Sequence, residues 1–300
     1  MTEQALTLPA RAKINLYLDI LSRRENGYHN ILSIMQSVGL SDTVTLTRLP
    51  GGSGIHVETD VPGLPCDRRN LAYRAAEKFA AILGQEPDVR IGIEKHIPMS
   101  AGLAGGSADA AAVLRGLDRL FGTNASREAL CRLGATLGAD IPFCVVGGAF
   151  VTEGIGEILT PCWGLAEDAW LVIACGGEGV STPDAYHALD EKYDNFATPR
   201  EGGERFAALR RALEAGEIAG VRENMYNIFE EIVLPTHSMA GRLIETMRAS
   251  GARTAMMSGS GPSVFGLFAA RETADRAAAQ IQASFGIEAH VTHPTPENEF

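Results

Sequence analysis

A segment of small residues, PMSAGLAGGSADAAAVL at positions 98–114, has the composition of an anion-binding loop. Gly102, Gly105 and Gly106 precede a helical pattern that starts at Ser107. The first turn of a helix has unpaired N–H groups and a partial positive charge, and glycine lets a ligand approach the backbone closely. This combination is typical of a phosphate site, although a tight strand-to-helix turn without a ligand has the same glycines. Ser107 either caps the helix or offers its hydroxyl to phosphate or Mg²⁺.

Two further groups of residues strengthen this interpretation. Lys13 and Asn15, in RAKINLYLDI, share one face of a predicted strand because side chains alternate along a strand. Asp140, in GADIPFCVVGG, lies between small residues and an apolar segment. Each residue type also has an ordinary structural role, the lysine on a solvated edge strand and the aspartate as an N-cap or turn residue. Neither group would point to a phosphate site alone.

Several other catalytic motifs are absent from the sequence. None of the lysines follows a glycine, which excludes a Walker A loop, and there is no G-x-G-x-x-G dinucleotide fingerprint. The motifs H-E-x-x-H and G-x-S-x-G are also missing. The cysteines are odd in number and have no C-x-x-C spacing, which argues against a disulfide framework and a cysteine-based zinc site. They are Cys66, Cys131, Cys144, Cys162 and Cys175.

The composition is that of a globular protein. The 300 residues suffice for two domains of roughly 150 residues each. A hydrophobic fraction of 45% and a charged fraction of 21% exclude a mostly disordered chain. The net charge of −11 argues against a sequence-independent nucleic-acid binder. The N-terminus lacks the pattern of a signal peptide, and no apolar run reaches the ~18 residues of a membrane span. We therefore expect a cytoplasmic protein without a nucleic-acid or membrane partner.

The elements that must position these residues mix strands and helices without strict β-α-β order. The patterns predict strands over 6–20, 28–40, 43–49, 54–60, 88–97, 142–154, 169–175 and 288–293, and a strand, glycine turn and strand over 254–268. They predict helices over 70–84 (with Asn70 as N-cap), 107–122, 126–138, 183–192, 203–215, 237–250 and 272–286. We expect an α+β protein with two domains, 1–158 and 159–300.

The order of these segments along the chain resembles that of the GHMP kinases, a family of small-molecule kinases. The matching segments are AKINLYL (12–18), NLAYRAA (70–76), PMSAGLAGGSADAA (98–111), GADIPF (138–143), VSTPDAY (180–186) and MSGSGPSVFGLF (257–268). RRENGYHNILSIMQSV (23–38) is similar to the R-x-D-G-Y-H segment of one branch, which phosphorylates a cytidine diphosphate-linked methylerythritol. That segment is what narrows the expected substrate.

The sequence departs from the family pattern at four positions. Ser100, Ala104 and Ala108 stand where the family loop has glycine, glycine and a small polar residue, and Asn26 stands where aspartate is common. Ala104 matters if its backbone needs a positive φ, where alanine is strained. All three loop substitutes are small, so we expect the loop to keep its shape with an altered affinity for ATP.

The resemblance implies a fold and a reaction. The N-terminal domain should be similar to ribosomal protein S5 domain 2 and the C-terminal domain to a ferredoxin-like α+β layer, with ATP and substrate in the cleft between them. The implied reaction transfers the γ-phosphoryl group of ATP, with Mg²⁺, to the 2-hydroxyl of the cytidylylated methylerythritol, on the non-mevalonate route to isoprenoid precursors. The alternatives are a kinase for another alcohol, such as homoserine or mevalonate, and a non-catalytic ATP or ligand sensor. We expect a monomer or weak homodimer.

The resemblance also implies residue roles. Asp140 matches the aspartate that accepts the hydroxyl proton, and Lys13 matches the lysine that keeps it ionised and stabilises the transferring phosphoryl group. The residues expected to bind ATP are Pro98, Met99, Ser100, Ala101, Gly102, Leu103, Ala104, Gly105, Gly106, Ser107, Lys95 and Asn70.

The substrate is expected to contact residues from three segments. By resemblance, Tyr28 and Tyr186 stack on cytosine and His29 binds its polar edge. Asn15 and Thr182 contact the sugar alcohol and its diphosphate. Taken singly, the two tyrosines are more often packing residues, and a lone histidine is more often structural. In the same way, SGSGP at 258–262 is, on its own, only a hairpin turn. Their joint occurrence in family order favours the functional interpretation.

Overall fold

The computed structural model describes residues 4–177, 179–193, 196 and 202–298. The strands in these ranges are β1 Ala5–Arg23, β2 His29–Arg48, β3 Ile55–Thr59, β4 Val89–Glu94, β5 Ala149–Glu153, β6 Ile158–Pro161, β7 Trp170–Ala174, β8 Tyr226–Asn227, β9 Thr254–Met257, β10 Val264–Phe268 and β11 Ala289–Thr292. The helices are α1 Leu71–Leu83, α2 Gly105–Phe121, α3 Arg127–Ala135, α4 Ile141–Val146, α5 Thr182–Lys192, α6 Gly202–Ala215, α7 Ile218–Asn224, α8 Glu230–Val233, α9 Ser238–Ala249 and α10 Arg271–Phe285.

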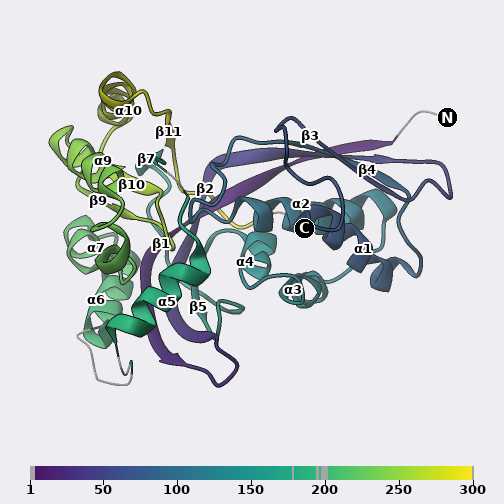
Figure 1. Cartoon of the computed structure of the whole chain (residues 1–300), viewed down its shortest axis with the longest axis horizontal. Coiled ribbons are helices and arrows are strands. Elements are labelled where there is room, and N and C mark those ends of the chain that lie inside the picture. Colours follow the sequence, from purple (N-terminus) through teal and green to yellow (C-terminus); the bar gives the residue numbers. More distant parts are fainter. Residues whose placement is uncertain (1–3, 178, 194–195, 197–201, 299–300) are drawn as a thin grey trace.

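The first sheet is built on a long antiparallel hairpin, β1 with β2, and has the order β3-β4-β2-β1-β8, with β5 on β2 and β6 on β5. Helices α1 to α4 lie along one side of it, with α2 packed on both central strands (Figure 1). The start of β1 alternates between more exposed and buried residues, whereas residues 12–20 are buried without interruption. The reason is that Leu18 and Ile20 join the core of the C-terminal half, so both faces of the strand are covered there.

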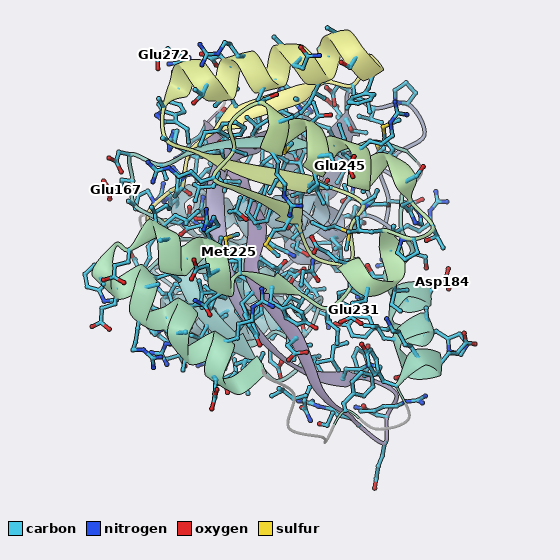
Figure 2. All side chains as sticks on the ribbon, turned by 90° about the vertical axis from the view of Figure 1, so that its left-hand side faces the viewer. Glu167, Asp184, Met225, Glu231, Glu245 and Glu272 are labelled. Carbon is cyan, nitrogen blue, oxygen red and sulfur yellow. The ribbon has the colours of Figure 1, made fainter. Side chains whose placement is uncertain are left out.

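The second sheet has the order β11-β7-β10-β9, and its neighbouring strands pair antiparallel. Counted along the chain, this is the fourth-first-third-second order of a β-α-β-β-α-β unit, as expected for a ferredoxin-like layer. Helices α9 and α10 cover it and bury Leu243, Met247 and Ile281. Figure 2 looks onto this helix layer, with Glu245 of α9 and Glu272 of α10 on its solvent side. The two sheets divide between β6 and β7.

The local signals for helix α1 are confirmed. The Asn70 side chain accepts a hydrogen bond from the Ala72 N–H at 2.9 Å, and Gly84 ends the helix at φ 81°. Helix α2 begins earlier than predicted, at Gly105, and its N-cap is Ala104, so Ser107 lies inside the first turn and does not cap the helix. In the described part of the chain, no helix is both long enough and apolar enough to cross a membrane.

The strand predicted over 142–154 is wrong in its first part and confirmed in its last. The structure has helix α4 over Ile141–Val146, followed by strand β5 from Ala149. Pro142 near the start of α4 suits a helix N-terminus, and Gly147 at φ 71° ends it. All six residues of the helix are buried, so the segment is a continuous apolar run without the periodicity that separates helix from strand. The strands predicted over 28–40 and 43–49 form one strand, β2.

The end of the chain returns to the first sheet. Residues 293–298, which we call the C-terminal tail, follow β11 and make isolated bridges to Val38 of β2 and to Gly147 beyond α4. In Figure 1 the end of the chain runs from β11 towards α2 and so leaves the layer of α9 and α10. Elements from both ends of the sequence therefore surround α4.

Candidate active site

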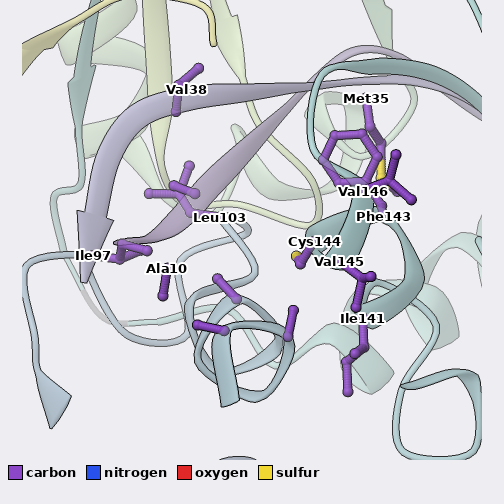
Figure 3. Close-up of a cluster of buried hydrophobic side chains, with 14 of the residues drawn as sticks. Ala10, Met35, Val38, Ile97, Leu103, Ile141, Phe143, Cys144, Val145 and Val146 are labelled. Carbon is purple, nitrogen blue, oxygen red and sulfur yellow. The ribbon is translucent and has the colours of Figure 1, made fainter. Parts of the chain in front are cut away.

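A cavity of about 990 Å³ lies where the loop before α2, the turn before α4, helix α5 and the start of β2 meet. Of the residues predicted to bind ATP or substrate or to catalyse, all but one line it. The exception is Leu103, which is buried in the core near Ala10 and Ile97 (Figure 3). Its carbonyl accepts a hydrogen bond from the backbone N–H of Lys13 at 3.1 Å, so it fixes the loop against β1.

One wall of the cavity is the loop 98–107, which we call the phosphate loop. Ser100, Gly102 and Ala104 have φ values of 52°, 77° and 59°, so alternate residues turn the backbone into the left-handed region. At Gly102 a Cβ would lie 2.2 Å from the Ser258 carbonyl oxygen, so only glycine fits there. The first N–H groups of α2 have no partner within the helix and border the cavity. Such successive backbone donors form a concave anion site.

The glycine hairpin 258–262, between β9 and β10, packs directly on the phosphate loop. The Ser258 hydroxyl donates to the Gly102 carbonyl at 3.3 Å, and the Ser263 N–H donates to the Ala101 carbonyl at 3.3 Å. Gly259 and Ser260 reach the cavity wall. The segment is thus the hairpin turn that its sequence indicates on its own, and it also supports the phosphate loop.

Lys13 lies beneath the phosphate loop with 5% of its surface exposed. Its ammonium donates to the Asn15 side-chain oxygen at 2.8 Å and to the Gly102 carbonyl at 3.1 Å. Asn15 in turn donates to the Ser33 hydroxyl at 2.8 Å. The lysine is therefore held in one position, with its charge at the junction of β1 and the loop.

Asp140 precedes α4 and lines the same cavity. Although it occupies the N-cap position, its side chain makes no capping hydrogen bond, so the carboxylate is not tied to the helix. Among the described residues, no ion pair joins it to Lys13, whose ammonium is bound to Asn15 and Gly102. The structure brings the two predicted catalytic residues into one cavity without direct contact.

Lys95 was expected beside the nucleotide, and its position shows a structural role. Its ammonium lies between the carboxylates of Asp42 and Asp109, at 2.7 Å from Asp109 Oδ2. Asp42 also accepts the backbone N–H groups of His96 and Ile97 at 2.6 and 2.8 Å. The buried triad thereby ties the entrance of the phosphate loop to β2 and α2. Burial raises the pKa of Asp109 to about 7, while the charge of Lys95 opposes the rise.

The opposite wall, which we call the aromatic wall, contains Tyr28, His29, Tyr186 and Phe229. The His29 ring stacks on Tyr186 at 4.8 Å between ring centroids, and Tyr186 meets Phe229 edge-on at 4.9 Å. His29 Nε2 lies 2.7 Å from Asp190 Oδ1. Tyr28 is 59% exposed, so its ring is open to a ligand. Burial raises the pKa of Tyr186 above its usual value.

The remaining predicted residues join the two walls. Thr182, the first residue of α5, lies 2.8 Å from the Ser260 hydroxyl, which links α5 to the glycine hairpin. The Asn70 side chain accepts from the Ala72 N–H and donates to the Pro65 carbonyl, so it acts as a helix cap at the edge of this cavity.

The sequence analysis did not identify Asp42, Asp190 and Phe229, because none of them lies in a segment with a recognisable motif.

Family models match both halves of the chain. The GHMP kinase N-terminal domain matches residues 70–148, and the GHMP kinase C-terminal domain matches residues 209–287. The chain belongs to the GHMP kinase family. This confirms the predicted two-domain GHMP kinase fold and a small-molecule kinase that takes its phosphoryl group from ATP.

Relatives and solved structures of GHMP kinases agree with this assignment. The chain is 41% identical to a 4-diphosphocytidyl-2-C-methyl-D-erythritol kinase from Caldicellulosiruptor saccharolyticus, over 98% of each chain. It is 40% identical to the Synechococcus enzyme of that name, over 98% of this chain and 95% of the relative. A crystal structure of 4-(cytidine 5'-diphospho)-2C-methyl-D-erythritol kinase superposes with a TM-score of 0.75 at 34% identity, covering 96% of this chain and 99% of that one. A homoserine kinase from Cytophaga hutchinsonii, at 19% identity and a TM-score of 0.77 over 100% of this chain and 97% of its own, shares the fold.

Proposed function

We propose that this GHMP kinase transfers the γ-phosphoryl group of ATP to the 2-hydroxyl of 4-diphosphocytidyl-2-C-methyl-D-erythritol. The observation that carries the proposal is a single cavity with a phosphate loop on one wall and the Tyr28–His29 aromatic wall on the other. A substrate with a nucleobase at one end and an alcohol at the other suits that arrangement. Relatives of that name, about 40% identical over nearly the whole chain, support it.

The chain's own residues would perform the transfer by positioning and by charge. Phosphoryl transfer needs little covalent help from the protein, so a held nucleophile and stabilised phosphate charge suffice. Asp140 would accept the proton of the substrate hydroxyl. The ammonium of Lys13, fixed by Asn15 and Gly102, would stabilise charge on the transferring group and favour ionised Asp140 across the cavity.

ATP would bind with its phosphates on the phosphate loop, where unpaired N–H groups and the positive end of α2 meet the anion. Pro98 and Met99, which is 53% exposed, would offer apolar surface to the nucleoside. Lys95 would act indirectly, by holding the loop entrance through Asp42 and Asp109. Its charge is already used by those two carboxylates.

The residues beside the phosphate loop fit Mg²⁺. This ion prefers oxygen ligands and usually combines one or two protein groups with phosphate oxygens and water. Ser107 lines the cavity and has a hydroxyl group, and the buried Oδ1 of Asp109 has no hydrogen-bond partner. In the described ranges no three His, Cys, Asp or Glu side chains cluster as a metal site, so ATP would supply most of the ligands. When bound, the ion would neutralise phosphate charge.

The aromatic wall would select cytidine. Asp190 Oδ1 lies within hydrogen-bond distance of His29 Nε2, and when Nε2 donates to it, Nδ1 of the singly protonated ring would accept a hydrogen bond. An acceptor suits the amino group of cytosine and opposes the carbonyl that uracil has in its place. Tyr28, with its exposed ring, would stack on the base, beside the His29–Tyr186 pair. Asn15 and Thr182 would contact the rest of the substrate.

The test is a steady-state kinase assay with product identification by mass spectrometry. The acceptors are the cytidylylated methylerythritol, its uridine analogue, methylerythritol phosphate, homoserine and mevalonate. We expect efficient turnover of the first alone. Turnover of homoserine or mevalonate at a similar kcat/KM would assign the chain to another alcohol. ATP binding without turnover of any acceptor would make it a sensor.

We also propose a cytoplasmic enzyme that works as a monomer or weak homodimer without nucleic acid. The net charge of −11 supports the last point, because nucleic-acid binders normally carry a basic surface. Sedimentation velocity at several concentrations tests the oligomeric state. A salt-dependent shift of labelled RNA or DNA by the protein would contradict the expected absence of nucleic-acid binding.

A further inference from the structure

The helix that follows Asp140 is too short to hold its own position. Helix α4 has six residues, and a helix of that length is marginal in water without tertiary contacts. At its start, Gly134 packs so closely on Ile141 that a Cβ there would lie 2.6 Å from the isoleucine side chain. The position of Asp140 therefore depends on what holds the two ends of α4.

At the other end of α4, a single residue of the C-terminal tail closes the helix. The last four carbonyls of a helix lack partners within it. The Phe143 carbonyl accepts the Gly147 N–H at 2.7 Å. The other three accept from Asn298, which donates through Nδ2 to Cys144 and Val145, at 3.0 Å each, and through its backbone N–H to Val146 at 2.6 Å. Asn298 is 8% exposed and satisfies the three remaining carbonyl groups at the C-terminal end of α4.

The same side chain also contacts the strand that bears Lys13. Arg11 Nη1 donates to Asn298 Oδ1 at 3.3 Å. Arg11 and Lys13 are two residues apart on β1, and the β1–β2 register is irregular between them. The Asn298 amide thus spans the two elements that carry the proposed catalytic residues, with its nitrogen on α4 and its oxygen on β1.

The tail itself is fastened beside Lys13. The Thr295 N–H donates to the Ser37 carbonyl at 2.9 Å, and Gln36 Nε2 donates to the Thr295 carbonyl at 3.3 Å. Ser37 is the residue that pairs with Lys13 across β1 and β2. Figure 3 shows the side chains of Cys144, Val145 and Val146 in the core that the tail closes, together with Val38 of β2.

We propose that Asn298 is a positioning residue for phosphoryl transfer, which sets the separation of Asp140 and Lys13 by holding α4 against β1. The proposal rests on the function proposed above. The two catalytic groups make no direct contact, so their separation is fixed only by the elements that carry them. A misplacement of about 1 Å can cost on the order of 100-fold in rate, which makes such a link matter for turnover.

The primary variant is Asn298→Asp, which keeps the shape of the side chain and removes its donor. The carboxylate would face the Cys144 and Val145 carbonyls, so α4 should detach at that end. We expect kcat to fall about 10- to 100-fold, with KM for ATP and for the cytidylylated substrate within about twofold of wild type. The control is Glu297→Gln, which alters only the exposed ion pair with Arg127 and should leave kcat unchanged.

A double mutant separates positioning from general damage. If Asn298 acts through Asp140, then Asn298→Asp should leave the residual kcat of an Asp140→Asn enzyme unchanged. A further loss in that background would overturn the proposal, and so would an effect confined to KM. Should Asn298→Asp fail to fold, Arg11→Met removes the link to β1 and keeps all three carbonyl bonds. We expect a severalfold loss of kcat in Arg11→Met, and a kcat equal to that of the wild type would overturn the proposal.

Failure of the proposed function gives a different result. In that case the wild-type enzyme itself does not phosphorylate the cytidylylated substrate.

Discussion

The two walls of the cavity are built in different ways. The phosphate loop is one continuous segment whose backbone N–H groups and left-handed residues form the site. The aromatic wall is made of side chains, and His29 meets Asp190 across 161 positions of sequence. A backbone site recognises any phosphate chain, whereas a set of side chains can distinguish one base from another. We therefore place ATP binding on the first wall and substrate choice on the second.

Asp140 lies between the walls, and its removal should have the largest effect. In Asp140→Asn the group proposed to accept the hydroxyl proton is lost while the shape is kept. We expect kcat to fall by about 10²–10⁴-fold, with ATP affinity and the unfolding midpoint near wild type. The matched control is Asp184→Asn, an exposed carboxylate on α5 (Figure 2) that should leave kcat unchanged. A folded Asp140→Asn enzyme with wild-type kcat would refute the assignment.

Lys13→Met tests whether the charge beneath the phosphate loop serves Asp140 or the phosphate. The methionine keeps the length of the side chain and removes the donor to Asn15 and Gly102. We expect a loss of kcat about as large as that of Asp140→Asn, and a double mutant no worse than the worse single variant, because groups that act as a unit are non-additive.

Steady-state kcat of both single variants and of the double variant provides the measurement. Losses that multiply in the double variant would mean that Lys13 acts on the phosphate independently of Asp140, in keeping with the lack of direct contact between them. Lys78→Met, an exposed lysine on α1, controls for the loss of a positive charge and should be silent.

At the aromatic wall the effect should appear in KM. Tyr28→Ala removes an exposed ring, and stacking of a base on an aromatic side chain is worth about 1–3 kcal/mol. We expect KM for the cytidylylated substrate to rise by roughly one to two decades, with KM for ATP unchanged. Tyr28→Phe keeps the ring and should stay near wild type. An equal rise in KM for ATP would contradict the assignment of ATP binding and substrate choice to different walls.

Tyr186→Ala should raise KM for the cytidylylated substrate by a similar factor. Its partly buried ring packs between His29 and Phe229, so the variant should also lower the free energy of unfolding, because these packing contacts are lost. Thermal unfolding measured beside steady-state kinetics separates the two effects. If KM is unchanged and only stability falls, Tyr186 is a packing residue.

The contrast between the walls also explains what the sequence could predict. The glycine spacing of the phosphate loop and the cap at Asn70 are local signals, and both predicted elements that the structure contains. The buried segment after Asp140 was predicted as a strand, because an apolar run has no periodicity to separate helix from strand. Lys95 was expected to bind ATP, but its partners Asp42 and Asp109 come from other elements, so its ion pairs depend on the tertiary fold. Asn298 gives no signal in the sequence, because its contacts with α4 and β1 form only when the C-terminal tail folds back onto the first sheet.

Asp190→Asn sharpens the role of the aromatic wall. The carboxylate holds the His29 ring by a charge-assisted bond, and the amide would weaken that hold and permit the other tautomer. We expect the preference for cytosine over uracil substrate, measured as a ratio of kcat/KM values, to fall by about tenfold. His29→Ala should lower it at least as far. Glu191→Gln, an exposed neighbour on the same helix, serves as the control. An unchanged ratio in both Asp190→Asn and His29→Ala would make His29 a structural residue.

The smallest effect is expected at Ala104, where the phosphate loop departs from the family pattern. Ala104 is the N-cap of α2 at φ 59°, a conformation that glycine adopts without the strain that a Cβ brings. Ala104→Gly should therefore raise the free energy of unfolding by up to about 1 kcal/mol. It should also lower KM for ATP slightly. Ala270→Gly is the matched control, because Ala270 caps α10 without a side-chain bond at φ −145°, where alanine is unstrained. Any benefit of glycine as a cap is common to both variants, so the difference between them isolates the strain. Equal changes in urea unfolding would show that the loop accommodates alanine at no cost.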